Sequence, residues 1–433
     1  MKNKFITYSS LLIALAFTMP ACKKNIGNLN SPVLEDYSNP SAAQLNNLVT
    51  GIEAGMRINV GTYLDVTGMI GREMYRFSGA EPRYVQDLLG AGSSTLNNNT
   101  FYLTNPWASR YRVVKNCNVL IQGAANASAL TPEDKKGFTG FGKTIKAYQL
   151  LLNLNFTYTN GIRVEVDDPD NLGPVLNYDE SLAAIAQMLD DARTDLTGAS
   201  ISFPLSSGFA GFDDEAGLLQ VNRALAARVA IYRQLWPAAL TALSSSFLDL
   251  TGPLDKGVYH VFGTGLGDQL NGAYFPQNQN GEVRLAHPSF ATDIAAGDDR
   301  LAKTTVRTAS ASSGGLTSNR DLWVYKSSLA PIPVIRNEEL ILIYAEAKIQ
   351  TNVLPDAVVA LNRIRTAHNL GAYSGAVTQA ALLNEMLTQR RFSLFYEGHR
   401  WVDMRRYNRL NQLPLDRAGD DVWDKFPLPL TEN

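Results

Sequence analysis

The side chains that most often perform catalysis occur in this sequence without the spacing that a catalytic site needs. Adjacent carboxylates occur in four places, at Asp167-Asp168, Asp213-Asp214-Glu215, Asp298-Asp299 and Asp420-Asp421. A glycosidase needs two carboxyl groups that face each other across a cleft, about 5–10 Å apart, and sequence neighbours do not establish that arrangement. Most of these acids lie in polar segments, which indicates a solvated surface.

The histidines and the known catalytic motifs give no stronger signal. His260, His287, His368 and His399 lack the spacing of HExxH or another metal-binding motif, and no EF-hand loop is present. No GxSxG elbow, P-loop or GxGxxG turn follows a strand-like segment. We therefore predict a protein that is not an enzyme and that has neither a cofactor nor a metal site.

Aromatic side chains in irregular segments offer a different chemistry. Sugar rings present C–H faces that stack on Tyr and Trp, while amide and carboxylate groups bind the hydroxyls. Two stretches rich in Gly, Ser and Asn, Gly79–Asn105 and Phe247–Val334, interrupt the helical pattern, and long irregular segments are often functional. Our candidate ligand-binding residues in them are Tyr84, Tyr102, Tyr274, Phe275 and Trp323. For each residue taken alone, packing inside the protein is the competing interpretation.

The charged run between Arg390 and Arg406 has two interpretations, an anion-binding site or a network of ion pairs. Asp403 lies three residues after Arg400 and three before Arg406, a spacing that supports pairing on a helix. Guanidinium groups suit partly buried networks with several hydrogen bonds. This spacing favours a structural network.

Helical periodicity covers most of the remaining chain. In Asn337–Gln350, Leu340, Ile343 and Tyr344 fall on one face, and Asn337 is placed to cap the helix. Other expected helices are Trp107–Gln122, Glu133–Tyr158, Tyr178–Leu196, Ala216–Leu235, one that opens at Pro355 and one over about 378–397. The sequence predicts a mainly α fold whose helix pairs are tetratricopeptide-like, although the period is irregular.

The N-terminus has the pattern of a secretory signal. Lys2 and Lys4 precede a short apolar run, Leu11–Phe17, which is too short to span a bilayer. Small Ala21 then precedes Cys22, so we predict a lipoprotein signal peptide over 1–21 and a lipid anchor on Cys22. The alternative is a secreted protein that is cleaved nearby and keeps a free thiol.

Composition bounds the rest of the protein. The 433 residues are 45% hydrophobic and carry a formal charge of −2, which is typical of a globular protein and excludes a strongly basic nucleic-acid-binding face. Cys117, the second of two cysteines, lies among apolar residues and is expected to be buried. We predict a polar tether over 22–40 and a single domain over 41–433, with a loop-rich insertion at about 247–334.

The C-terminal third resembles the SusD/RagB family. The resemblance lies in Tyr344-Ala345-Glu346-Ala347, in LNRIR at 361–365, in RRFSLFYEGHRWVDMRR at 390–406 and in FPLP at 426–429. Weaker matches occur at Trp107, Tyr111, Asn116–Asn118 and Asp299–Leu301. Two positions depart from the family pattern: Gln389 replaces a common Glu, and Lys23-Lys24 follow the cysteine where acidic residues are frequent.

This resemblance implies a SusD-like helical fold with long irregular loops that face the ligand. It also implies a lipoprotein on the outside of the cell outer membrane, which acts as a hinged lid on a SusC-like TonB-dependent barrel. Such a lid binds a glycan or an oligopeptide, closes and delivers it, and its closure requires contacts made only in the closed state. A surface-anchored hydrolase and a scaffold with a helical body remain the alternatives.

Overall fold

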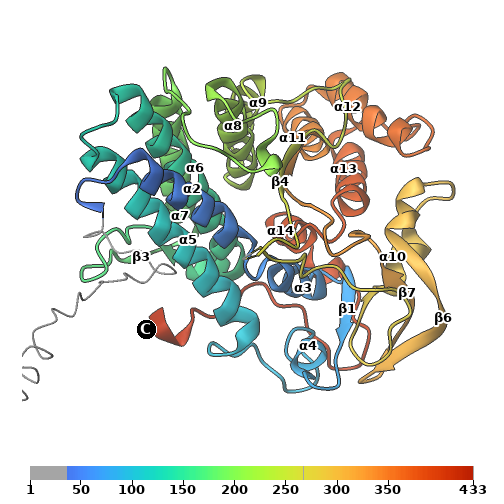
Figure 1. Cartoon of the computed structure of the whole chain (residues 1–433). Helices are drawn as coiled ribbons and strands as arrows, with labels where there is room; N and C mark the ends of the chain where they lie inside the picture. Colours follow the sequence, from blue (N-terminus) through green and yellow to red (C-terminus); the bar gives the residue numbers. More distant parts are fainter. Residues whose placement is uncertain (1–36, 267, 433) are drawn as a thin grey trace, which may run out of the picture.

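The computed structural model describes residues 37–266 and 268–432, so the predicted signal peptide, Cys22 and most of the tether lie outside the described residues. Helices dominate the described part, which confirms the predicted mainly α fold (Figure 1). The longer ones are α2 (Ala42–Arg57), α3 (Val60–Ile70), α5 (Phe101–Asn126), α6 (Pro132–Thr157), α7 (Tyr178–Leu196), α8 (Glu215–Tyr232), α9 (Trp236–Ser244), α11 (Asn337–Gln350), α12 (Leu354–Ala367) and α13 (Gln379–Ser393). Short helices are α4 (Arg83–Gln86), α10 (Pro288–Asp293) and α14 (Arg400–Arg406).

Helices that follow one another along the chain pack against one another, as expected for tetratricopeptide-like pairs. α5, α6 and α7 lie side by side on the left of Figure 1, and α8 packs on α7 and α9. The start of α7 was predictable because Asn177 and Glu180 form a capping box. Gly140 allows α6 to approach α7, since a Cβ there would lie 2.5 Å from Cγ of Leu196.

α11 is buried on most of its surface, which corrects the prediction of a helix with one apolar face. Leu340 and Ile343 belong to the main hydrophobic core, whereas Ile341 and Leu342 belong to a second core with α12 and α13. A helix that packs into two cores is apolar on most of its sides, so its apolar residues need no single helical stripe. Asn337 is also not the N-cap but the first residue of the helix.

Strands occupy much of the stretch that the sequence presented as irregular. An antiparallel sheet has the order β1 (Met74–Phe77), β5 (Val283–Ala286), β7 (Leu316–Leu322), β6 (Thr304–Ser313) and lies on the right of Figure 1. Two-stranded pairs join β2 (Ile162–Arg163) to β3 (Val175–Leu176) and β4 (Gly257–His260) to β8 (Ile332–Arg336). Among the described residues, none of the helices has the length and apolarity required to cross a membrane.

Candidate functional site

The charged run between Arg390 and Arg406 forms a buried ion-pair network. Arg390 donates to Asp403 at 2.6 Å, and Arg406 donates to the other oxygen of Asp403 at 3.0 Å and also pairs with Glu346. The predicted Asp403–Arg406 pair is therefore confirmed, whereas the carboxylate that Arg400 was expected to share is occupied by Arg390. These guanidinium groups are engaged inside the protein, which supports the structural interpretation of the run.

Burial lowers the pKa of two histidines, His399 and His260. Burial lowers the pKa of His399 to about 4, although Glu339 opposes this shift, and burial lowers the pKa of His260 to about 3. Cys117 is buried and burial raises the pKa of its thiol to about 12, which confirms its prediction as a core residue. Within the described residues, no group of His, Cys, Asp and Glu is arranged to hold a metal ion.

Two of the nominated aromatic residues, Tyr84 and Tyr102, are buried, which agrees with the competing interpretation of packing inside the protein. Tyr84 is 3% exposed, its hydroxyl accepts a hydrogen bond from Arg76 at 2.6 Å, and the Arg76 guanidinium lies 4.2 Å from its ring centroid. Tyr102 is 0% exposed and donates to Asp87 at 2.9 Å. Phe101 packs edge-on against both rings. Both tyrosines therefore hold the segment before α5 in place and offer no free ring face.

The other three nominated residues form what we call the aromatic ledge: Tyr274, Phe275 and Trp323. All three are half-buried, and the rings of Tyr274 and Trp323 lie 6.2 Å apart at 52°. Phe275 stacks under Arg284, whose guanidinium lies 5.2 Å from the ring centroid. The structure thus brings together residues from the β4–β5 connection and from the end of β7.

Backbone contacts fix both sides of the aromatic ledge. The backbone N–H of Trp323 donates to Lys303 O at 2.7 Å. Upstream of Tyr274, the Asn271 side chain donates to Ala330 O at 2.7 Å and accepts from Ala273 N at 2.7 Å. The two ring-bearing segments are therefore held by hydrogen bonds rather than by the rings alone.

The chain that follows Phe275 reaches a groove of about 620 Å³ three residues later, at Asn278. We call it the polar groove; it is lined mainly by Phe77–Gly79, Asn278–Gly281 and Arg307–Ser313. Gln277 anchors the connecting segment by donating to Thr305 at 2.8 Å. Because three residues span at most about 10 Å, the groove adjoins the aromatic ledge.

An irregularity in the β6–β7 pairing creates one wall of the polar groove. Val306 pairs with Arg320 and Ala311 pairs with Ser318, so the residues 307–310 leave the ladder. Asn278 accepts from the released N–H of Thr308 at 2.8 Å, and Arg307 pairs with Asp321 and donates to Gln279 O. Thr308, Ser310 and Ser312 remain exposed. Such bulges often redirect side chains beside a site, and here they direct hydroxyl groups toward solvent.

The sequence analysis missed the residues of the polar groove. Most of these residues are small or polar, as in any solvent-exposed loop, and they lie in Asn278–Gly281 (NQNG) and in 307–313 (RTASASS). The only available signal was their place inside a stretch that already held three nominated aromatic residues.

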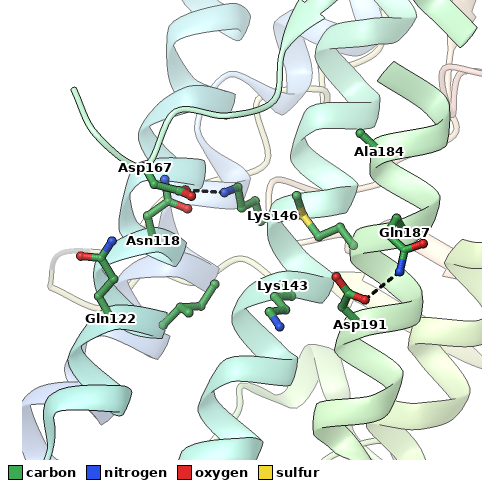
Figure 2. Close-up of a pocket in the computed structure, with 10 residues that line it drawn as sticks. Asn118, Gln122, Lys143, Lys146, Asp167, Ala184, Gln187 and Asp191 are labelled. Atoms are coloured by element: carbon green, nitrogen blue, oxygen red, sulfur yellow. Dashed lines mark hydrogen bonds and ion pairs between the residues drawn. The ribbon is translucent and has the colours of Figure 1, made fainter. Parts of the chain in front are cut away.

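A second cavity, of about 330 Å³, lies between α5, α6 and α7 (Figure 2). Its charged groups are already engaged: Lys146 binds Asp167 at 2.6 Å, Gln187 donates to Asp191 at 2.8 Å, and Lys143 binds Asp195 at 2.6 Å. A ligand would have to break these pairs, so this cavity is a weaker candidate than the aromatic ledge.

The comparisons with known proteins agree on one fold. Residues 304–424 match the model of the SusD family. A SusD superfamily protein from Bacteroides vulgatus has a TM-score of 0.70 at 15% identity, with 90% of this chain and 96% of that chain covered. A SusD superfamily protein from Parabacteroides distasonis has a TM-score of 0.67 at 17% identity, with 93% and 97% covered.

A third similar structure is described with its ligand. Surface glycan-binding protein A from Bacteroides thetaiotaomicron, in complex with laminarihexaose, has a TM-score of 0.68 at 14% identity, with 91% of this chain and 97% of that chain covered. No curated protein matches the sequence. The matched C-terminal region contains the whole run RRFSLFYEGHRWVDMRR at 390–406, and together with the shared fold it makes this chain similar to the SusD family.

Proposed function

We propose that this protein binds glycans on the aromatic ledge and in the polar groove without transforming them. The observation that carries the proposal is the pair of half-buried rings, Tyr274 and Trp323, beside a groove lined by amides and hydroxyls. Rings bind the apolar faces of sugars, and amides and hydroxyls bind their edges. The complex of a similarly folded protein with laminarihexaose supports the same class of ligand.

The lining of the polar groove supports binding rather than hydrolysis. The side chains that line it are amides, hydroxyls, one guanidinium, small apolar groups and the ring of Phe77, with no Asp or Glu among them. Glycoside hydrolysis generally uses two opposed carboxyl groups. The protein would therefore retain a bound glycan intact and pass it on.

In this proposal the protein delivers the bound glycan to a SusC-like TonB-dependent barrel. Acylation of Cys22 would hold the domain over 41–433 at the outer face of the outer membrane through the tether over 22–40. The match of residues 304–424 to the model of the SusD family supports this arrangement. An oligopeptide cargo is the alternative ligand.

The binding proposal is tested by calorimetric titration with laminarihexaose, maltohexaose, cellohexaose and a set of oligopeptides. We expect a hexaose to bind, and Trp323→Ala or Tyr274→Ala to weaken that binding roughly tenfold or more, because losing an aromatic contact costs on the order of 1–2 kcal/mol. Trp236→Ala, which removes an equally half-buried indole from α9, is the matched control and should leave affinity unchanged.

Three outcomes contradict parts of this proposal. Unchanged affinity in Tyr274→Ala, Phe275→Ala and Trp323→Ala would refute the aromatic ledge as the site. Binding of oligopeptides alone would replace the ligand class. Release of shorter products from a bound hexaose would establish the hydrolase alternative.

The partner is tested separately by purifying the lipidated protein from its native outer membrane and identifying what accompanies it by mass spectrometry. We expect a TonB-dependent barrel with the wild type and its loss with Cys22→Ala, which removes the anchor. Recovery of the wild type alone from solubilised membranes would rule out a stable complex with the barrel.

A further inference from the structure

A cavity of about 500 Å³ lies where the ends of α6 and α8 meet the start of α7. We call it the tyrosine cavity, and the residues that define it are Tyr158, Asp179, Tyr178, Tyr232, Arg233 and Gln234. It shares no lining residue with the aromatic ledge or the polar groove. In Figure 1, α7 and α8 lie to the left of the sheet that carries β6 and β7.

The walls of the tyrosine cavity are aromatic and fixed. Tyr158 and Tyr178 meet edge to face, with centroids 4.6 Å apart at 65°. The Arg405 guanidinium covers the Tyr158 ring at 4.2 Å. Tyr232 is 4% exposed and lines the cavity from the end of α8. These contacts give the cavity a preformed shape, as ligand sites generally have.

Part of the polar lining of the tyrosine cavity is engaged, because Thr159, Asn177 and Arg406 have hydrogen-bond or ion-pair partners, and the rest is not. In Figure 2, by contrast, the charged groups are paired. In the described part of the chain, the hydroxyls of Tyr158, Tyr178 and Tyr232 have no hydrogen-bond partner. The Arg233 guanidinium, the Asp179 carboxylate and the Gln234 amide also lack one there. Tyr232 is buried overall, but its hydroxyl reaches the cavity, where it can bond to water or to a ligand.

The backbone adds an independent observation at the same place. Tyr158 and Gln234 follow the ends of α6 and α8 with φ of 47° and 57°. This left-handed conformation is uncommon for residues other than glycine, and for a bulky side chain it is an outlier. Strained residues of this kind cluster at functional sites. Here the conformation places both side chains on the lining of the cavity.

We propose that the tyrosine cavity is a second saccharide site, which holds one or two neutral hexose units of a bound glycan. The charges on its lining balance, because Arg233 opposes Asp179 and Arg406 is already paired with Glu346 and Asp403. Aromatic walls with alternating donors and acceptors suit a ring that carries hydroxyl groups. This inference rests on the proposed glycan capture, since both assign a saccharide ligand.

Two separate saccharide sites would change how the protein holds a polymer. A chain that reaches both sites gains an effective local concentration at the second site once the first is filled. Long or branched glycans that reach both sites would therefore bind more tightly than short ones, although the contacts at each site are the same.

The test uses the protein over 41–433 with ring-¹³C-labelled tyrosine and laminarihexaose, maltohexaose and cellohexaose as probes. The signals of Tyr178 and Tyr232 are assigned with Tyr178→Phe and Tyr232→Phe. We expect at least one probe to shift both signals in the wild type and in Trp323→Ala, in which the aromatic ledge is removed. Arg233→Ala should weaken that response about tenfold, since it removes a charged hydrogen-bond donor worth roughly 1.5 kcal/mol. Arg112→Ala, an exposed arginine on α5, is the matched control.

The outcomes separate this site from the aromatic ledge. Loss of the tyrosine shifts in Trp323→Ala, or no shift with any probe, overturns the second site. If a hexaose still binds the wild type in calorimetry and Trp323→Ala weakens that binding, the proposed glycan capture stands without the second site. If the shifts persist and Trp323→Ala leaves calorimetric binding unchanged, the tyrosine cavity is a site and the aromatic ledge is not.

Discussion

Individual buried ionisable residues give this protein a specific dependence on pH, and Glu73 shows it most clearly. Burial raises the pKa of Glu73 to about 8, and the nearby Arg400 opposes the shift only in part. One carboxyl oxygen accepts from Tyr396 N at 3.3 Å, while the other has no hydrogen-bond partner among the residues that the structure describes. The folded protein therefore keeps a proton here that the unfolded chain releases above its ordinary pKa of 4.5.

The sign of the effect follows from proton binding. Between the ordinary pKa and the raised one, the folded state binds more protons than the unfolded state, so stability falls as pH rises. We expect Glu73→Gln to flatten this fall and to be more stable than the wild type at pH 8 by roughly 1–3 kcal/mol, the cost of an unsatisfied buried polar group. Urea unfolding at pH 5 and pH 8 measures it. Glu165→Gln, which removes an exposed carboxylate, should change nothing, and equal slopes in all three proteins would contradict the assignment.

Single residues also show where sequence analysis reached its limit. An aromatic residue in a Gly/Ser/Asn-rich segment has the same local sequence whether the segment folds over it or leaves it exposed. Tyr102 is covered because Phe101 and Phe426 pack against its ring, and Phe426 lies more than 300 residues away. Tyr274 and Trp323 stay half-buried. The sequence nominated all of these residues alike and could not separate the two buried tyrosines, Tyr84 and Tyr102, from the residues of the aromatic ledge.

At the scale of elements, helices were predictable and strands were not. The predicted bounds of Tyr178–Leu196 and Asn337–Gln350 coincide with α7 and α11, because caps and helical period are local signals. Met74 of β1 pairs with Ala286 of β5, more than 200 residues away, and no local pattern records such a partner. Most residues of strand β6 (TTVRTASASS) are also small or polar, so its composition resembles that of a loop and does not indicate a strand.

The first residue of α11 links that helix to the segment before β4. The Asn337 side chain donates to Asp249 O at 2.8 Å and Pro253 O at 3.0 Å and accepts from Asp249 N at 2.9 Å. Asn337→Ala leaves these buried groups unsatisfied, so we expect a loss of stability of roughly 2–4 kcal/mol. Chemical denaturation measures the loss. Asn384→Ala, at an exposed amide on α13, is the control, and an equal small effect from both changes would refute the role of Asn337.

At the scale of the whole molecule, Asp65 joins segments that are far apart in sequence. Its carboxylate on α3 binds Arg284 of β5 at 2.8 Å, Arg76 of β1 at 2.8 Å and the Tyr396 hydroxyl at 2.6 Å. Burial alone would raise the pKa of Asp65, but Arg284 and Arg76 hold it below its ordinary value. Arg284 in turn donates to Gly272 O at 3.1 Å and lies over Phe275. The same carboxylate therefore supports both the sheet and the aromatic ledge.

Asp65→Asn tests this connection, because it leaves two guanidinium groups without their buried counter-charge. Breaking a buried ion pair in this way costs roughly 3–5 kcal/mol. We expect that loss in equilibrium unfolding, together with weaker hexaose binding at temperatures where the variant is folded, since Arg284 no longer holds Phe275 and Gly272. Asp213→Asn, at an exposed carboxylate that forms no ion pair within residues 37–266 and 268–432, should alter neither property. Wild-type stability in Asp65→Asn would refute the structural role, and wild-type affinity with lowered stability would show that the aromatic ledge is positioned independently of Asp65.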